Sequence, residues 1–398
     1  MEVHLDLYQT VAMAVVVYFI GSKLKSKINF FQKYCIPAPV VGGLLFALVT
    51  LVLNLTGTLT LITDDTMQKV FMTLFFTSVG YTASLKLLKK GGRQVMIFVM
   101  VCTLLIVMQN IVGVSLAKLF GLEPLLGLCV GSVPMIGGHG TAGSIGEMLE
   151  HMGVHGAASI SVAAATFGLV TGSMIGGPVG NRLIKKHNLH CEVHVNAQGV
   201  EEFTEEKLQV KTTTEQYLSA FCMLFLAAGI GSVISALIEK TGMTFPPYIG
   251  AMLAAALLRN LSDVTQKFNV MEDVVGTLGN VSLTLFLSMA LMGLKLWQLA
   301  GLAAPMIVML LAQTLLMLIF SYFIVYNLMG RDYESAVMAS ASCGFGMGAT
   351  PNAIANMQTI TAVYGPAPKS FFIVPLVGSL FIDFVNGTAI TIFINILT

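Results

Sequence analysis

Charged side chains are scarce in this sequence. Only 10% of its 398 residues are charged, whereas 56% are hydrophobic, and the mean hydropathy is +0.83. A soluble domain has about 25% charged residues, so this composition argues against a soluble enzyme and against a disordered chain. The net charge of +1 supplies no basic field for nucleic acid. The six cysteines show no CxxC spacing, and we interpret them as small buried hydrophobic residues.

Long apolar runs are what the sequence has instead. A transmembrane helix needs about 20 mostly apolar residues. Ten segments qualify, with approximate bounds: 5–22, 36–55, 67–88, 95–120, 156–181, 215–238, 245–260, 273–294, 301–329 and 370–396. Because these runs are long and do not alternate with polar residues, they predict helices rather than a barrel. The predicted fold class is an all-α polytopic membrane protein with ten transmembrane helices.

Lysine and arginine set the predicted orientation of these helices. With the N-terminus outside, 17 of the 21 Lys and Arg residues fall on the inner side and 4 on the outer side. The positive-inside rule then places both termini outside and the hydrophilic stretch 182–214 in the cytoplasm. This stretch carries His187, His190 and His194 near Cys191. A metal site is one interpretation of these four residues, but we favour a solvated linker.

The two halves of the sequence resemble each other at an offset of 208–209 residues. Segment 39–43 matches 247–251, segment 119–123 matches 328–332, and Gly137 and Thr141 match Gly346 and Thr350. Each half holds five predicted spans, and because five is odd, the second copy enters the membrane from the opposite side. We therefore predict two inverted repeats, 1–181 and 215–398, joined by the linker 182–214. Such repeats are typical of secondary transporters, which bind substrate near the midplane.

Glycine-rich segments interrupt both halves between the fourth and fifth spans. They cover 124–147 and 334–358, and their cores read GSVPMIGGHGTAGSIGEML from 131 and SCGFGMGATPNAIANMQTI from 342. Broken backbone at membrane depth is tolerated where it lines a cavity, and a helix that begins after the glycines directs N–H groups at an anion. We predict a re-entrant hairpin in each half. The alternative is close helix packing through small residues.

The predicted substrate-binding residues lie mostly in these hairpins and supply N–H groups, hydroxyls and amides. They are Gly138, His139, Gly140, Thr141, Ser144, Gly346, Gly348, Thr350 and Asn352, with Asp383 added from the tenth span. For His139, a hydrogen-bonded structural role is favoured over proton transfer. Glu147 is expected at the outer mouth of the first hairpin, in contact with solvent.

Asp383 is the one carboxylate deep in the predicted spans, and ionisable residues at that depth are functional candidates. It neutralises Na⁺ or a substrate ammonium in our interpretation, and the alternative is a structural role in capping hairpin backbone. The candidate Na⁺ ligands are Asp383, Asn386, Asn280 and Ser282. The embedded polar residues Gln109, Asn110, Thr166, Asn280, Ser282 and Gln313 are each favoured as interhelical hydrogen-bonding groups over ligands, so a ligand role is the alternative for Asn280 and Ser282. No Lys or Arg lies at the midplane, which favours Na⁺ coupling, with proton coupling through Asp383 or His139 as the alternative.

Five motifs stand out along the chain: IPAPVVGGLL at 36–45, MQN at 108–110, GGHGT at 137–141, LGNVSLTLFLSMALMGLKLW at 278–297 and GFGMGATPNAIANMQ at 344–358. Together they resemble the bacterial sodium/glutamate symporter family, over about residues 5–395. The resemblance implies a Na⁺-dependent L-glutamate carrier of the inner membrane that forms a homodimer and works by an elevator-like movement. It also marks the hairpin residues Gly137 to Thr141, Gly346, Gly348, Thr350, Pro351 and Asn352.

Three other functions are weighed against this prediction. A Na⁺- or H⁺-coupled carrier of another small carboxylate or amino acid is hardly separated from it by sequence. A channel needs a continuous polar pore, which paired inverted hairpins argue against. A membrane enzyme is disfavoured because the spans contain no nucleophile–base pair, metal motif or phosphate loop.

Overall fold

The computed structural model describes residues 2–33, 36–86, 92–191, 213–240, 248–266, 270–294, 296 and 302–398. Regular structure in this part is helical except for two short parallel strands, β1 (Glu2–Leu5) and β2 (Thr60–Thr63), in which Glu2 pairs with Thr60. Within these residues, seven helices are long and apolar enough to cross a membrane, or eight if the bent pair α18 (Pro368–Leu380) and α19 (Ile382–Leu397) is one span. The prediction of a helical polytopic membrane protein is confirmed.

Two predicted spans correspond to shorter helices, α4 (Thr66–Thr82) and α12 (Ile249–Thr265). Each has 17 residues, or about 26 Å of helix at 1.5 Å per residue. The hydrocarbon core of a bilayer is about 30 Å thick, so length alone does not make either helix a membrane span. The total of ten transmembrane helices therefore stays a prediction.

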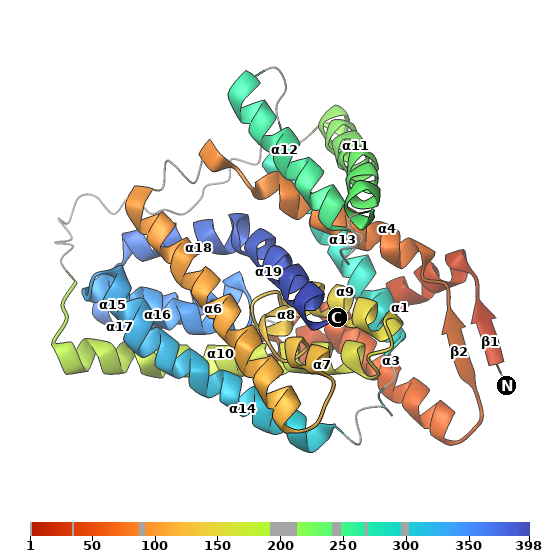
Figure 1. Cartoon of the computed structure of the whole chain (residues 1–398), viewed down its shortest axis with the longest axis horizontal. Helices are drawn as coiled ribbons and strands as arrows, with labels where there is room; N and C mark the ends of the chain where they lie inside the picture. The colour runs from red at the N-terminus through yellow and green to blue at the C-terminus, as the bar shows by residue number, and fades with distance from the viewer. Residues whose placement is uncertain are drawn as a thin grey trace.

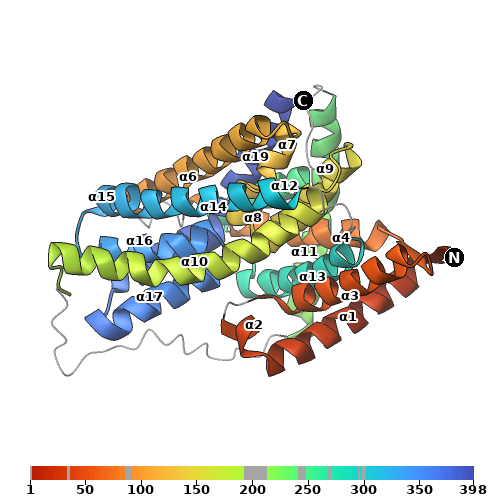
Figure 2. The ribbon, with the colours of Figure 1, turned by 90° about the horizontal axis from the view of Figure 1, so that it is seen from below.

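The helices pack into two bundles, and each bundle takes helices from both halves of the sequence. The flanking bundle comprises α1 (Leu7–Lys27), α2 (Asn29–Lys33), α3 (Ala38–Leu55), α4, α11 (Thr214–Glu239), α12 and α13 (Glu272–Met292). The hairpin bundle comprises α6 (Gly92–Leu119), α7 (Pro124–Leu128), α8 (Ser132–Met135), α9 (Gly138–His151), α10 (Ala157–His187), α14 (Ala303–Ile319), η2 (Phe320–Val325), α15 (Tyr326–Met329), α16 (Tyr333–Gly346), α17 (Thr350–Tyr364), α18 and α19. Figure 1 shows α11 and α12 crossing α4 on one side, with α10, α14 and α16 on the other. Figure 2 shows α1 and α3 side by side, away from α16 and α17.

Glycines bring the helix backbones into contact in the same way in both halves. A Cβ atom added at Gly21 of α1 would lie 2.1 Å from the Ala38 carbonyl oxygen of α3. A Cβ atom added at Gly250 of α12 would lie 2.2 Å from the Gly231 carbonyl oxygen of α11. Side chains at these positions would force the helices apart, so small residues are required there. The matching α1–α3 and α11–α12 crossings are the packing expected of a repeated sequence.

The two bundles touch chiefly where α9 lies on α13 and where α18 and α19 lie on α4. The face of α9 at this contact is made of glycine. A Cβ atom added at Gly140 would lie 3.1 Å from the Phe75 ring and 3.3 Å from the Leu283 side chain, and one at Gly143 would lie 3.2 Å from the Phe286 ring. The contact is therefore a smooth helix face against large apolar side chains, with no interlocking side chains from α9 at these two positions.

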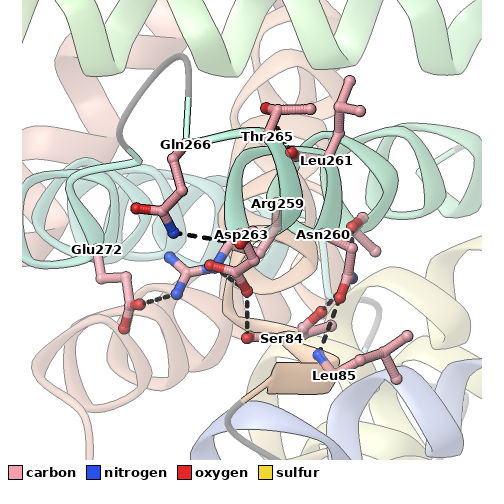
Figure 3. Close-up of polar contacts among 11 residues, drawn as sticks. Ser84, Leu85, Arg259, Asn260, Leu261, Asp263, Thr265, Gln266 and Glu272 are labelled. Atoms are coloured by element: carbon pink, nitrogen blue, oxygen red, sulfur yellow. Dashed lines mark hydrogen bonds and ion pairs between the residues drawn. The ribbon is translucent and has the colours of Figure 1, made fainter.

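A buried arginine fastens one end of the flanking bundle. Arg259 of α12 pairs with Glu272 at the start of α13, and its Nε lies 3.4 Å from Asp263 Oδ2 (Figure 3). Ser84, just after α4, donates to Asp263, and Asn260 Nδ2 donates to the Ala83 carbonyl at 2.8 Å. The network thus ties α4, α12 and α13 together. Arg259 is only 8% exposed, so removing it would leave carboxylates poorly compensated.

The predicted linker 182–214 begins inside a helix, because α10 runs on to His187. Within the described residues, His187 stacks on the Tyr326 ring at 5.1 Å between centroids, and Cys191 Sγ donates to the Pro366 carbonyl at 3.2 Å. Residues 192–212, and with them His194, lie outside the described part of the chain.

Candidate functional site

The first glycine-rich segment folds as three short helices, α7, α8 and α9, separated by turns. Helix α9 begins at Gly138, whose φ of +58° is a left-handed conformation that favours glycine. No side chain caps this end of the helix. The first helical bond is donated by the Thr141 N–H to the Gly137 carbonyl at 3.3 Å, so the N–H groups of residues 138–140 precede it.

The second glycine-rich segment folds as two helices, α16 and α17, which pack along each other across a turn at residues 347–349. Helix α17 begins at Thr350, with Pro351 in its first turn, and no side chain caps its start. Proline suits this position because the first N–H groups of a helix have no partner within it. Both glycine-rich segments therefore present an uncapped helix N-terminus.

The tips of the two segments meet, although they are more than 200 residues apart in sequence. A Cβ atom added at Gly138 would lie 3.2 Å from the Gly348 carbonyl oxygen. The structure thus brings together Gly138, His139 and Gly140 at the start of α9 with Gly348 and Thr350 at the start of α17. A helix N-terminus favours anions through its free N–H groups and dipole, so the meeting of the two tips is a candidate substrate site.

Buried amide side chains hold the second tip in place. Gln109 Nε2 of α6 donates to the Gly346 carbonyl at 2.7 Å, and Gln313 Nε2 of α14 donates to the Gln109 carbonyl at 2.8 Å. Asn352 Nδ2 of α17 donates to the Leu169 carbonyl of α10 at 2.9 Å and to Ser173 Oγ at 2.8 Å. The Gly346 carbonyl stands at the end of α16, and a carbonyl at a helix end needs such a partner in a membrane interior. The other bonds join α14 to α6 and α17 to α10.

A second set of buried amides surrounds α8 in the first segment. The Ser132 N–H donates to Asn110 Oδ1 of α6 at 2.9 Å, and Asn386 Nδ2 of α19 donates to the Ser132 carbonyl at 3.1 Å. Ser132, Asn110 and Asn386 are each fully buried. Sequence reasoning identified Asn386 but not Ser132, because an isolated serine in an apolar run carries no signal.

Several oxygen atoms around the two tips are buried without a hydrogen-bond partner among the described residues. They are Gln109 Oε1, Gln313 Oε1, Asn352 Oδ1, Asn386 Oδ1 and Ser132 Oγ. A buried polar atom left unpaired costs about 1–3 kcal/mol, so such a group calls for a ligand. Oxygen atoms of this kind are the ligands that hard cations prefer.

Asp383 lies in the first turn of α19, one turn before Asn386, and is half-buried. Asp383 and Ser144 of α9 both lie near the Tyr248 hydroxyl, which is buried without a hydrogen-bond partner among the described residues. Tyr248 stands at the start of α12, and its ring stacks on Phe76 with centroids 3.7 Å apart. Sequence reasoning missed Tyr248; its one signal was its place in the repeated segment 247–251.

His139 makes a hydrogen bond that defines its tautomer. Its Nε2 lies 3.0 Å from Thr166 Oγ1, and that hydroxyl donates to the Val162 carbonyl at 3.1 Å. Because the threonine proton is used there, the hydroxyl accepts from His139 Nε2–H. The ring is buried. This geometry is that of a hydrogen-bonded structural histidine.

The remaining predicted ligands are not part of the contact between Gly138 and Gly348. Asn280 is exposed on α13, and Ser282 Oγ donates to the Leu278 carbonyl of its own helix at 2.8 Å. Ser144 Oγ donates to the Thr141 carbonyl at 3.1 Å within α9, and a Cβ atom added at Gly346 would meet Leu105 and Met317. Their assignment to substrate or Na⁺ stays a prediction.

Comparison with known proteins identifies the family of this chain. Residues 3–366 match the family described as the sodium/glutamate symporter. The chain is 39% identical over 392 residues to a protein named sodium/glutamate symporter from Escherichia coli (strain K12), covering 98% of each chain. It is 36% identical over 388 residues to the protein of that name from Haemophilus influenzae, covering 97% of this chain and 96% of the relative. The prediction of a transporter rather than an enzyme is confirmed by these relatives, and the chain belongs to the sodium/glutamate symporter family.

Proposed function

We propose that this protein imports L-glutamate with Na⁺ across the bacterial inner membrane, and that the substrate binds between the two hairpin tips. The observation that carries the proposal is that two uncapped helix N-termini meet: α9 begins at Gly138, α17 begins at Thr350, and Gly138 approaches the Gly348 carbonyl. Glutamate has two carboxylates, and each N-terminus binds one of them. Asp383 faces the substrate ammonium, and Tyr248 lies beside it.

In this proposal Na⁺ binds to the buried oxygen atoms around the tips that have no hydrogen-bond partner among the described residues. Asn386 Oδ1 and Ser132 Oγ are the first pair, because both are unpartnered and Asn386 already bonds the Ser132 carbonyl. Asp383, one turn away, supplies negative charge, and Asn280 and Ser282 are further candidates. An ion at this place orders α8, which leads directly into the tip that binds substrate. Na⁺ and glutamate are coupled because each stabilises the same hairpin.

The fold is a pair of inverted repeats with ten transmembrane helices, two re-entrant hairpins and both termini outside. Each half contributes three helices to the flanking bundle and one glycine-rich segment to the hairpin bundle. This repeated order of elements supports the proposal. Transport is an elevator-type movement of the hairpin bundle along the flanking bundle. The glycine face of α9 against Phe75, Leu283 and Phe286 is a surface that permits sliding. The protein is a homodimer in this proposal.

Uptake of labelled glutamate into proteoliposomes tests the function. We expect uptake when Na⁺ is outside and none when K⁺ replaces it, and competition by aspartate, citrate and neutral amino acids defines the substrate range. Asp383→Asn keeps the size and removes the charge, and we expect at least a tenfold loss of uptake, on the order of 1.4 kcal/mol. Glu123→Gln, which removes an exposed carboxylate before α7, is the matched control. Na⁺-independent uptake would contradict the coupling, and normal uptake by Asp383→Asn would contradict the role of Asp383.

Alternating access is tested from the two sides of the membrane. Thr350 is half-buried at the start of α17, so Thr350→Cys in a background without reactive cysteines is expected to react with an impermeant maleimide from either side. Na⁺ with glutamate changes the ratio of the two rates. Reaction from one side only, under all conditions, would exclude the movement.

A further inference from the structure

A cavity of about 460 Å³ opens where the two bundles meet, beside strand β2. Its walls come from α3, β2, the start of α4 and the end of α13 in the flanking bundle, and from α9 and the start of α10 in the hairpin bundle. Four of its polar side chains are Asp65, Gln68, Glu147 and His151. The proposed transport mechanism uses none of them.

Three of these side chains are arranged as metal ligands. One oxygen of Asp65, one oxygen of Glu147 and one ring nitrogen of His151 all lie within 4.8 Å of one another. His151 Nε2 and Glu147 Oε1 are 3.8 Å apart. In a tetrahedral zinc site with bonds of about 2.0–2.1 Å, ligand atoms stand roughly 3.3–3.4 Å apart. Side-chain rotation of His151, which is 67% exposed, is enough to close the difference.

The surroundings of the three residues support this interpretation. Gln68, which is 6% exposed, donates to Glu147 Oε2 and leaves Oε1, the atom nearest His151, available. A hydrogen bond to the second oxygen of a carboxylate orients it as a metal ligand. Lys69 Nζ lies 2.6 Å from Asp65 Oδ2 and balances the negative charge of that carboxylate.

We propose that Asp65, Glu147 and His151 form a binding site for a divalent transition-metal ion of the Zn²⁺ class, open to the cavity and completed by water. One imidazole and two carboxylates are a ligand set that Zn²⁺ accepts, with one position left for solvent. The ion joins the start of α4 in the flanking bundle to the last turns of α9 in the hairpin bundle.

This position gives the ion a mechanical effect, and that part of the inference rests on the proposed function. If the hairpin bundle moves along the flanking bundle, Glu147 and His151 move away from Asp65. A bound ion holds the three together, so it favours the conformation seen here and slows turnover. External Zn²⁺ is therefore an inhibitor of uptake that acts away from the glutamate site.

Binding is measured first, on the purified full-length protein in detergent, by competition with a chromophoric Zn²⁺ chelator. We expect one Zn²⁺ per chain. Loss of an outer-shell partner weakens metal binding by about 10–100-fold, which we expect for Gln68→Leu, and Asp65→Asn and His151→Ala, which remove ligands, weaken it further. His155→Ala removes an exposed histidine four residues further on and leaves binding unchanged. Absence of stoichiometric binding, or equal loss in His155→Ala, would overturn the site.

Inhibition is measured second, as Na⁺-driven glutamate uptake with and without external Zn²⁺. We expect Zn²⁺ to lower uptake by wild type and His155→Ala, EDTA to restore it, and His151→Ala to be insensitive. Stoichiometric binding without inhibition would refute the idea that the bound ion holds the two bundles together and slows turnover. Absence of uptake in every variant would refute the proposed function and leave the binding result to decide the site.

Discussion

Gly138→Ala is the sharpest perturbation of the tip contact. Gly138 has φ of +58°, and alanine in a left-handed conformation costs about 1–2 kcal/mol. The new Cβ atom would also lie 3.2 Å from the Gly348 carbonyl oxygen, which is closer than ordinary van der Waals contact, so one tip must move by a few tenths of an ångström. Total stability of a domain is about 5–15 kcal/mol, so the protein still folds.

The displacement falls between the two helix N-termini that bind substrate. Misplacement of a binding group by about 1 Å can cost roughly a hundredfold in rate, and a shift of a few tenths of that is expected to lower uptake about tenfold. The thermal midpoint of the detergent-solubilised protein measures the strain, and uptake per folded molecule measures the loss of function. Both are needed because strain and site disruption have separate effects.

Gly121→Ala is the matched control for this variant. Gly121 has φ of +68°, and a Cβ atom added there would meet nothing within 4 Å. It therefore pays a similar backbone strain without touching a neighbour, and uptake per folded molecule should match wild type. Equal loss of uptake in both variants would show that strain, not the tip contact, is responsible. Normal uptake by Gly138→Ala would refute the site itself.

Three further variants test other contacts. Gln109→Leu removes the donor to the buried Gly346 carbonyl and also the unpaired Gln109 Oε1; these changes of about 1–3 kcal/mol each oppose one another, so the thermal midpoint should change little while uptake weakens. Arg259→Met breaks the buried ion network at the end of the flanking bundle and should cost about 3–5 kcal/mol; uptake per folded molecule stays normal, and a normal midpoint would contradict its role. Tyr248→Phe keeps the stacked ring and removes the hydroxyl near Asp383, so uptake falls while the midpoint is unchanged; unaffected uptake would exclude the hydroxyl from the site.

The helices and their interruptions were largely predictable, because both follow from local composition. The predicted span 36–55 became α3, Ala38–Leu55, which starts directly after Pro37. The glycines of both segments broke the helices where expected, with α9 starting at Gly138 and α17 starting after Gly348. Apolar run length and glycine content act within a few residues, so a sequence carries them directly.

The partners of each residue were harder to predict, because they are set by packing between distant segments. Nothing local indicates that Gly138 meets Gly348, or that Asp65 approaches Glu147. The face of a helix is also hard to assign when apolar residues surround it. Asn280 sits in an apolar run and is a predicted Na⁺ ligand candidate, whereas the structure leaves it exposed on α13; its role stays a prediction.

The unpaired oxygens around the tips give Na⁺ a way to stabilise the protein that does not require glutamate. Asn386→Leu removes one such oxygen and also the donor to the Ser132 carbonyl. Each change is worth about 1–3 kcal/mol with opposite sign, so the midpoint without Na⁺ should change little. The stabilisation by Na⁺ should be largely lost in this variant. The free energy of unfolding of wild type rises by about 2.7 kcal/mol at a Na⁺ concentration of 100 times Kd, whereas that of Asn386→Leu rises much less.

Asn395→Leu, on the same helix, removes an amide whose Nδ2 donates to the Thr391 carbonyl; this variant should keep the full Na⁺ response, and K⁺ should give none in any variant. A wild-type Na⁺ response in Asn386→Leu would show that Na⁺ does not bind at Asn386. Coupling through α8 would then be excluded as well. A lost Na⁺ response together with Na⁺-independent uptake would separate ion binding from transport. If both are lost, the ion and the substrate share one hairpin, because the substitution removes only the Asn386 amide, which contacts α8 and belongs to neither helix N-terminus.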